Sequence, residues 1–234
     1  MSFESLGLAP FLLRALAEQG YENPTPIQQQ AIPLALAGRD LLAGAQTGTG
    51  KTAAFGLGLL QSIDPSLIRV QALVLCPTRE LADQVGKQIR KLATGIPNLK
   101  LLLLVGGVPL GPQLASLEGH DPHVVVGTPG RVQELARKRA LNLGAVRTLV
   151  LDEADRMLDM GFIHDVRKVL ALLPQHKQSL LFSATFSDEI KALAQGLLRN
   201  PKLIQVTPAN TTAQRVRQVI YPVGRDQKMA LLKH

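Results

Sequence analysis

The chain contains seven short runs of apolar residues, and each run is almost continuously apolar instead of alternating with polar residues. Such runs are typical of strands that are covered on both faces, as in a parallel sheet. Helical patterns, for example over 79–93 and 187–199, separate the runs and fit right-handed crossovers between parallel strands. The sequence therefore predicts an α/β fold with an open, mostly parallel sheet flanked by helices. The runs cover 40–44, 71–76, 99–105, 123–127, 148–152, 179–183 and 203–206.

Length and composition favour one large globular α/β domain with an anionic partner. The chain has 234 residues, of which 46% are hydrophobic, and its 26 basic and 18 acidic residues give a net charge of +8. Nucleic acid is the usual partner of a basic domain, although a generally basic protein fits the charge equally well.

Cys76 lies in an apolar run and is interpreted as a buried thiol. The five histidines lack metal-ligand spacing, and no leader or membrane span is visible, so we expect a cytoplasmic protein.

A glycine-rich loop follows the first apolar run and precedes a helical pattern. In this loop, "AQTGTGKT" at 45–52, backbone N–H groups and the helix N-terminus would form a cradle for phosphate. Lys51 would neutralise the β- and γ-phosphate oxygens, and the Thr52 hydroxyl would bind Mg²⁺. The strict pattern requires glycine at position 45, where this chain has Ala45. The strand–loop–helix context still favours a P-loop over a glycine-rich turn with a solvated lysine.

The run at 148–152 ends in an acidic pair that a P-loop would need. Asp152 is expected to bind Mg²⁺, and Glu153 to orient and polarise the attacking water. The alternative is that both residues merely favour the start of the next helix. Their combination with the P-loop makes the catalytic interpretation the stronger one.

Two helical segments precede the first strand. One begins at Pro10, with Gly20 as its C-terminal cap, and the other begins at "TPIQ", where Pro33 is expected to break or kink it. Gln28 has two interpretations. Its carboxamide could read adenine, but Gln28 three residues after Thr25 also matches a capping box, which the spacing alone favours.

Taken together, these motifs resemble the N-terminal motor domain of DEAD-box RNA helicases, closest to the bacterial RhlE-like subgroup. The resemblance spans nearly the whole chain, and an aromatic residue, Phe3, precedes Gly20 by seventeen positions as in that family's Q motif. The matching segments, in the family's order, are "GYENPTPIQ" (20–28), "AQTGTGKT" (45–52), "PTRELADQ" (77–84), "GG" (106–107), "TPGR" (128–131), "DEAD" (152–155) and "SAT" (183–185).

The resemblance implies a RecA-like P-loop NTPase domain that uses ATP and Mg²⁺, with Lys51, Asp152 and Glu153 as catalytic residues and Thr52 and Asp152 at the metal. It implies nucleotide contacts from Tyr21, Thr25, Gln28, Ala45, Gln46, Thr47, Gly48, Thr49, Gly50, Lys51 and Thr52. Gln28 would contact adenine, with Tyr21 packed near the base. A bond from Asp155 to Ser183 or Thr185 would couple the ATP site to the RNA side.

RNA binding is implied through Pro77, Thr78, Arg79, Gly106, Gly107, Thr128, Pro129, Gly130 and Arg131. Hydroxyls, backbone N–H groups and arginines can hold phosphates without reading bases. Only 3% of the residues are aromatic, which excludes a stacking platform of the RRM type, so recognition of the RNA backbone is expected. Either arginine taken singly would be interpreted as a solvated basic residue.

The family's unwinding activity needs a second RecA-like domain that supplies arginine fingers, and none of its motifs is present here. We divide the chain into a Q-motif region (1–30), a RecA-like ATP-binding helicase domain (31–207), and a linker with the start of the second domain (208–234). A chain of this kind is a truncated form or a fragment, and alone it should bind nucleotide with little hydrolysis.

Two other function classes stay open at this point. One is a non-catalytic RNA-binding module that keeps ATP as a structural ligand, and Lys51, Asp152 and Glu153 speak against it. The other is a P-loop ATPase that acts on DNA or protein, which the motifs at 20–28, 77–80 and 152–155 disfavour.

Overall fold

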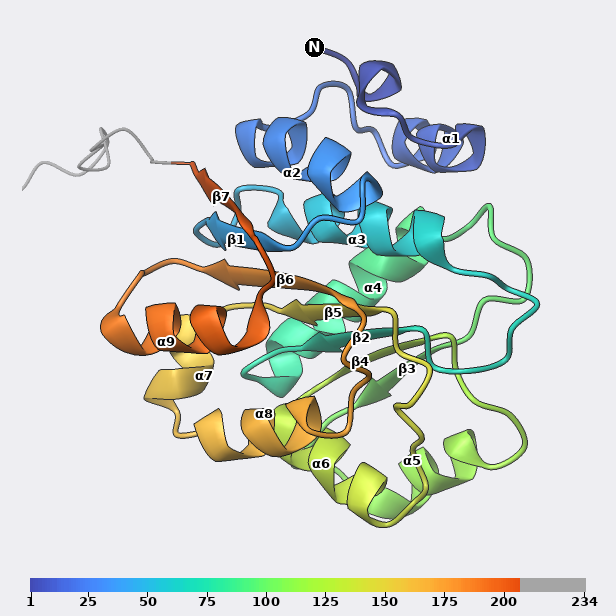
Figure 1. Cartoon of the computed structure of the whole chain (residues 1–234). Coiled ribbons are helices and arrows are strands. Elements are labelled where there is room, and N and C mark those ends of the chain that lie inside the picture. The colour runs from blue at the N-terminus through green and yellow to red at the C-terminus, as the bar shows by residue number, and fades with distance from the viewer. Residues whose placement is uncertain (207–234) are drawn as a thin grey trace, which may run out of the picture.

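The computed structural model describes residues 1–206, and the predicted linker and start of a second domain lie outside the described residues. Within them, seven strands form one parallel sheet in the order β3-β4-β2-β5-β6-β1-β7 (Figure 1). The predicted parallel α/β fold is confirmed, and every predicted apolar run overlaps a strand. The strands are β1 (Leu41–Gly44), β2 (Ala72–Leu75), β3 (Leu101–Leu104), β4 (Val124–Gly127), β5 (Thr148–Leu151), β6 (Gln178–Ser183) and β7 (Lys202–Gln205).

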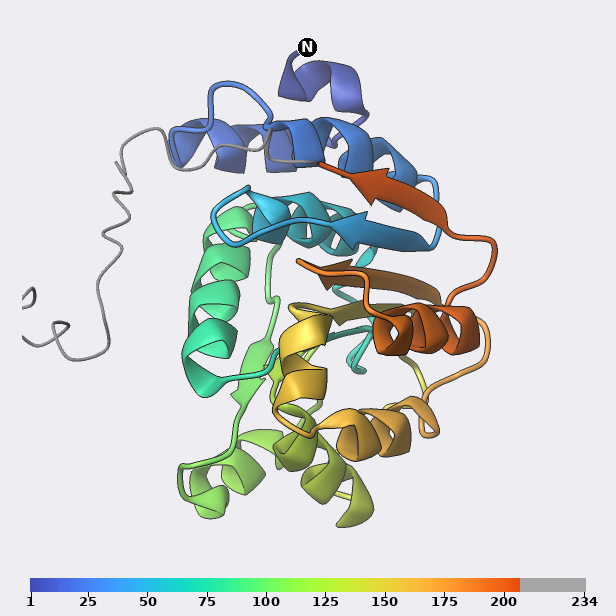
Figure 2. The ribbon, with the colours of Figure 1, turned by 90° about the vertical axis from the view of Figure 1, so that its left-hand side faces the viewer.

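Helices cover both faces of this sheet (Figure 2). They are the 3-10 helix η1 (Phe3–Leu6) and the α-helices α1 (Pro10–Glu18), α2 (Pro26–Leu36), α3 (Lys51–Ser62), α4 (Arg79–Leu92), α5 (Leu110–Leu117), α6 (Pro129–Arg137), α7 (Ala154–Asp159), α8 (Ile163–Leu170) and α9 (Asp188–Leu197). Among the described residues, none of these helices combines the length and apolar character that crossing a membrane requires.

Alternate residues of the central strands point to two separate apolar clusters. Val74 of β2 packs with residues of α1 to α4, whereas its neighbours Leu73 and Leu75 pack with residues of α6 to α9. All three side chains are fully buried. This two-sided burial explains why the strands are continuously apolar in the sequence. Cys76 directly follows β2 and is buried as predicted.

The helix starts follow the predicted chemistry, with one exception inside α2. The helix α1 begins at Pro10 and ends one residue before the Gln19–Gly20 turn. The helix α2 begins at Pro26 but continues through Pro33 to Leu36, so the prediction of a break was wrong. Packing explains the difference, since Ile32 and Ala35 on either side of the proline are buried, which keeps the segment helical despite the missing N–H group.

Candidate nucleotide and RNA site

The motifs predicted from the sequence follow the carboxyl ends of the strands, and the strand order divides them into two groups. The strands β5, β6 and β1 are neighbours, so Asp152, Ser183 and the loop 45–50 lie together. The strands β3, β4 and β2 are also neighbours, which places the loops that start at Val105, Thr128 and Cys76 side by side. In open α/β sheets, ligands bind at these strand ends. One half of the edge is therefore suited to a nucleotide and the other to a second ligand.

The loop between β1 and α3 has the backbone of a phosphate cradle. Gly48 and Gly50 adopt left-handed φ angles of 84° and 86°, which glycine accepts readily. Gly50 also has no room for a side chain, because a Cβ there would lie 2.5 Å from Gln28 Nε2. The loop and Lys51–Thr52 line a cavity of about 380 Å³ whose opposite wall is α4. Of the described P-loop residues, Ala45, Gln46 and Thr49 do not line this cavity.

Lys51 carries the positive charge at the base of this loop. It is 5% exposed, and its Nζ lies 3.0 Å from Asp152 Oδ1 and 3.4 Å from Glu153 Oε1. The Thr47 hydroxyl donates to the same glutamate oxygen at 3.0 Å. The P-loop lysine and both acidic residues thus converge at one point, although Lys51 and Asp152 are separated by about 100 residues in the sequence.

Asp152 is fully buried, and burial raises the pKa of its carboxyl group despite the opposing effect of Lys51. Neither carboxylate oxygen receives a well-directed hydrogen bond from residues 1–206. A buried carboxylate without such a bond is suited to a cation, and the hydroxyl of Thr52, the residue after Lys51, would be a second oxygen ligand. These residues fit Mg²⁺, which needs few protein ligands when phosphate oxygens supply others. The described part of the chain contains no group of three or more His, Cys, Asp or Glu side chains that could hold a metal ion.

Glu153 reaches the P-loop because of an unusual backbone conformation. Its φ of 53° and ψ of 52° are left-handed, which is rare for a residue other than glycine, asparagine or aspartate. This conformation turns the chain sharply between β5 and α7, and it accompanies the contacts of the carboxylate with Thr47 and Lys51. Strained residues of this kind occur preferentially at functional sites.

The Q-motif segment is attached directly to the P-loop. Gln28 is 1% exposed, its Oε1 accepts from the Thr25 N–H at 2.9 Å, and its Nε2 donates to Gly50 O at 3.1 Å. The Thr25 hydroxyl donates to Thr49 O at 2.8 Å. The bond between the Gln28 side chain and the Thr25 N–H, which a capping box requires, is therefore present. The same carboxamide also bonds to the P-loop at Gly50. Contact with adenine stays a prediction.

The DEAD segment is bonded to the segment after β6. Asp155 Oδ2 accepts from both the N–H and the hydroxyl of Thr185, each at 3.1 Å. Ser183 instead donates its hydroxyl to Thr185 O at 2.7 Å. Of the two partners predicted for Asp155, the structure places Thr185 in contact with it. The coupling role of this bond stays a prediction.

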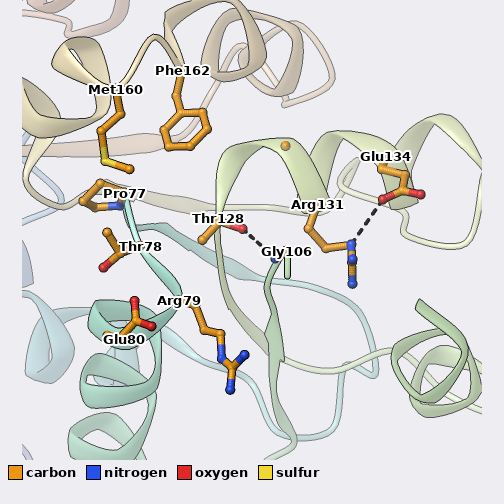
Figure 3. Close-up of a pocket in the computed structure, with 11 residues that line it drawn as sticks. Pro77, Thr78, Arg79, Glu80, Gly106, Thr128, Arg131, Glu134, Met160 and Phe162 are labelled. Carbon is orange, nitrogen blue, oxygen red and sulfur yellow. Dashed lines mark hydrogen bonds and ion pairs between the residues drawn. The ribbon is translucent and has the colours of Figure 1, made fainter. Parts of the chain in front are cut away.

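A second cavity, of about 470 Å³, lies on the other half of the sheet edge (Figure 3). Of the residues predicted to bind RNA, it brings together Pro77, Thr78, Arg79, Gly106, Thr128, Gly130 and Arg131. The predicted residues Gly107 and Pro129 are absent from its lining in the described chain. Thr78 is also the N-cap of α4 and accepts from the Leu81 N–H.

Three side chains hold the GG loop that borders this cavity. The Thr128 hydroxyl accepts from the Gly106 N–H at 3.1 Å, and Gln113 Nε2 donates to Val105 O at 3.0 Å. Arg131 Nη2 donates to Val108 O at 2.9 Å. Its Nε pairs with Glu134 at 3.1 Å, an interaction that is marked in Figure 3. The GG and TPGR motifs are therefore one connected unit. Arg79 is exposed, whereas the guanidinium of Arg131 is mostly buried.

The sequence motifs missed part of the cavity wall. Glu80, Glu134, Met160 and Phe162 line it as well, and Figure 3 shows Met160 and Phe162 on the side opposite Arg79. Glu80 stands inside the "PTRE" motif, and Met160 and Phe162 follow α7 directly, so their closeness to known motifs was the available signal. Two acidic and two apolar side chains make this cavity less uniformly basic than the motifs suggested.

The parallel sheet, the glycine cradle and the convergent Lys51, Asp152 and Glu153 define a P-loop nucleotide-binding domain of the RecA-like class. Comparison with known families makes the assignment more specific. The family described as DEAD/DEAH box helicase matches residues 25–193. This chain belongs to that family.

Curated relatives agree over almost the whole chain. The ATP-dependent RNA helicase DbpA of Escherichia coli (strain K12) is 48% identical over 226 residues, which cover 97% of this chain and 49% of the relative. The ATP-dependent RNA helicase CshA of Listeria monocytogenes is 43% identical, over 98% of this chain and 44% of the relative. The chain thus spans about half the length of these relatives.

Solved structures share the fold. A DEAD box protein from the hyperthermophile Methanococcus jannaschii superposes with a TM-score of 0.84 at 41% identity, covering 88% of this chain and 56% of that chain. S. cerevisiae Dbp5 bound to RNA and ADP BeF3 gives a TM-score of 0.78 at 35% identity, over 88% of this chain and 52% of that chain.

Proposed function

We propose that this chain is the ATP-binding motor domain of an ATP-dependent RNA helicase. The observation that carries the proposal is the convergence of Lys51, Asp152 and Glu153 on a glycine cradle, beside a separate cavity built from three loop motifs. The DbpA and CshA relatives are named as ATP-dependent RNA helicases, and the Dbp5 neighbour was solved with RNA and ADP BeF3. The RhlE-like subgroup, the cytoplasmic location and the three-part division at residues 30 and 207 stay predictions.

In the proposed reaction, loop N–H groups and Lys51 hold the nucleotide phosphates, and Glu153 positions the attacking water and accepts its proton. Mg²⁺, held by Asp152 and Thr52, would neutralise charge on the transferred phosphoryl group. The second cavity would hold the sugar-phosphate backbone of RNA through Thr78, Arg79 and Thr128. Local unwinding requires the second RecA-like domain, which would close on this one and supply an arginine finger. Such fingers contribute on the order of 10³–10⁵ in rate, so this chain alone should turn over ATP slowly.

Nucleotide titration tests the proposed nucleotide binding. We expect fluorescent ADP to bind the chain in the presence of Mg²⁺ and GDP to bind at least about tenfold more weakly. Gln28→Ala should weaken the binding of ADP. Equal binding of ADP and GDP, with little effect of Gln28→Ala, would make Gln28 a helix cap only and remove the adenine assignment. Competition between RNA and DNA oligonucleotides of one sequence tests the second ligand, because contacts to the 2′-OH should favour RNA.

A further inference from the structure

A hydrogen bond connects Tyr21, in the Q-motif segment 20–28, to a residue of α4 that lies outside every motif recognised in the sequence. Gln88 Nε2 donates to the Tyr21 hydroxyl at 2.7 Å, across 67 positions of sequence. Gln88 lies in the third turn of α4, whereas the motif "PTRELADQ" ends at residue 84. This bond therefore needs an explanation that the motifs do not provide.

Tyr21 is held by two further contacts, one of its ring and one of its backbone. It contacts Phe3 edge to face, with ring centroids 6.2 Å apart and an interplanar angle of 79°. Phe3 is itself 4% exposed, so it is a fixed support. The Tyr21 N–H donates to Leu16 O at 2.9 Å. The backbone and one ring edge of Tyr21 are thus fixed, and the bond from Gln88 fixes the hydroxyl end.

Gln88 also faces the nucleotide side of the molecule. Its side chain lines the cavity of about 380 Å³ together with Gly48, Gly50, Lys51 and Thr52. Within residues 1–206, its bond to Tyr21 is the single hydrogen bond of its carboxamide, which leaves Oε1 and one N–H proton directed at no other side chain. A residue in this position can act on a bound nucleotide through Tyr21, and its remaining polar atoms are available at the cavity wall.

From these contacts we propose that Gln88, which lines the P-loop cavity, is a positioning residue for the adenine base and acts by fixing the ring of Tyr21. The proposal rests on the nucleotide-binding function proposed above and on the prediction from the sequence that Tyr21 packs near the base. A ring fixed at both ends loses less conformational freedom when a base packs on it, so preorganisation appears as affinity. The effect belongs to the base and not to the phosphates, which the P-loop holds.

The experiment is a double-mutant cycle on the 234-residue chain, with ADP and inorganic tripolyphosphate as the two probes. Gln88→Ala and Tyr21→Phe remove the two ends of one hydrogen bond. Each should weaken ADP binding about three- to tenfold, and the double variant should be no weaker than the stronger single effect. Affinity for tripolyphosphate should stay within a factor of about two, because it lacks the base. The matched control is Lys87→Ala, the adjacent exposed position of α4, which should leave both affinities unchanged.

The outcomes separate this inference from the proposed function. Fully additive losses in the double variant, or an unchanged ADP affinity of Gln88→Ala, would overturn the role of Gln88 while nucleotide binding by the wild type stands. An equal loss of tripolyphosphate affinity in Gln88→Ala would also overturn it, because the defect would then be a general one of the cavity. Failure of the wild-type chain to bind ADP at all would instead remove the proposed function.

Discussion

Lys51 Nζ lies 3.0 Å from Asp152 Oδ1, and both side chains are almost completely buried. A buried ion pair recovers only part of the free energy that its two charges lose on leaving water. Here the balance is unfavourable for the carboxylate, since burial raises the pKa of Asp152 in spite of Lys51. The site therefore holds a negative charge that costs stability, at the place where a cation is proposed to bind.

The first prediction concerns the loss of stability that the buried charge of Asp152 causes. The pKa of Asp152 is higher in the folded than in the unfolded chain, so its contribution to stability is greatest below the unfolded pKa and is lost as pH rises through the folded value. Asp152→Asn should therefore gain stability relative to the wild type as the pH rises through the folded pKa of Asp152, because the variant carries no buried carboxylate charge. Glu153, 3.4 Å away, remains a partner for Lys51. Urea unfolding at several pH values measures this, and parallel pH profiles for the two proteins would contradict it.

The second prediction separates binding from turnover at Glu153. Glu153→Gln keeps the size of the side chain and can still accept from the Thr47 hydroxyl. ADP affinity of this chain should change less than about threefold. In a protein that joins this chain to a second RecA-like domain, ATP turnover should fall at least about 100-fold, because a carboxamide cannot accept the proton. A variant that hydrolyses ATP at the wild-type rate would exclude Glu153 as the base.

The third prediction distinguishes the two arginines that line the second cavity. Arg79 is exposed, whereas Arg131 is paired with Glu134 and holds Val108 O. Arg79→Ala should weaken the binding of single-stranded RNA. It should also reduce the slope of log K against log salt concentration by about 0.7, the value for one phosphate contact. The Arg131→Gln, Glu134→Gln double variant leaves net charge unchanged. It should weaken the binding of RNA because the GG loop loses its bond from Arg131. The salt slope should stay the same.

Fluorescence anisotropy of a labelled RNA at four or five salt concentrations measures both slopes. If the double variant lowers the slope as much as Arg79→Ala does, Arg131 contacts phosphate directly and its pairing with Glu134 is not maintained in the complex. ADP affinity, measured in parallel, should be the same in both variants, because the two cavities have separate linings.

The fourth prediction compares two glycines of the P-loop. Gly48 and Gly50 have nearly equal left-handed φ angles, so alanine at either position should cost about 1–2 kcal/mol of conformational strain. Only at Gly50 would the new Cβ also meet Gln28 and Thr25 side-chain atoms, at 2.5 and 3.0 Å. Gly50→Ala should therefore lower the free energy of unfolding further than Gly48→Ala. Equal losses in urea unfolding would show that the Gln28 carboxamide moves aside freely.

Much of the fold was predictable because burial on both faces leaves a direct mark in the sequence. Each fully apolar run, such as Leu73–Leu75, proved to be a strand of a parallel sheet. The strand order was not predictable, since apolar runs carry no information about which neighbour they pair with. That order is what separates the nucleotide cavity from the second cavity.

At the site, the motifs predicted the charged residues but few of their partners, Thr185 for Asp155 being one that was predicted. The left-handed turn at Glu153 has no signal in the sequence, because glutamate rarely adopts it. The sequence offered a helix cap and an adenine contact for Gln28, and neither interpretation included its bond to Gly50. The helix through Pro33 shows tertiary packing outweighing a local preference. Gln88 stands in no motif, and only the fold brings it to Tyr21.

The helix α4 forms part of the wall of both cavities. Its first residue, Arg79, lines one cavity, while Gln88, in its third turn, lines the other and holds Tyr21. Its 14 residues form a rod about 21 Å long. A rod supported at both ends transmits tilt and translation, so a displacement that widens one cavity moves the wall of the other. The two proposed ligand sites therefore share one rigid helix within a single domain.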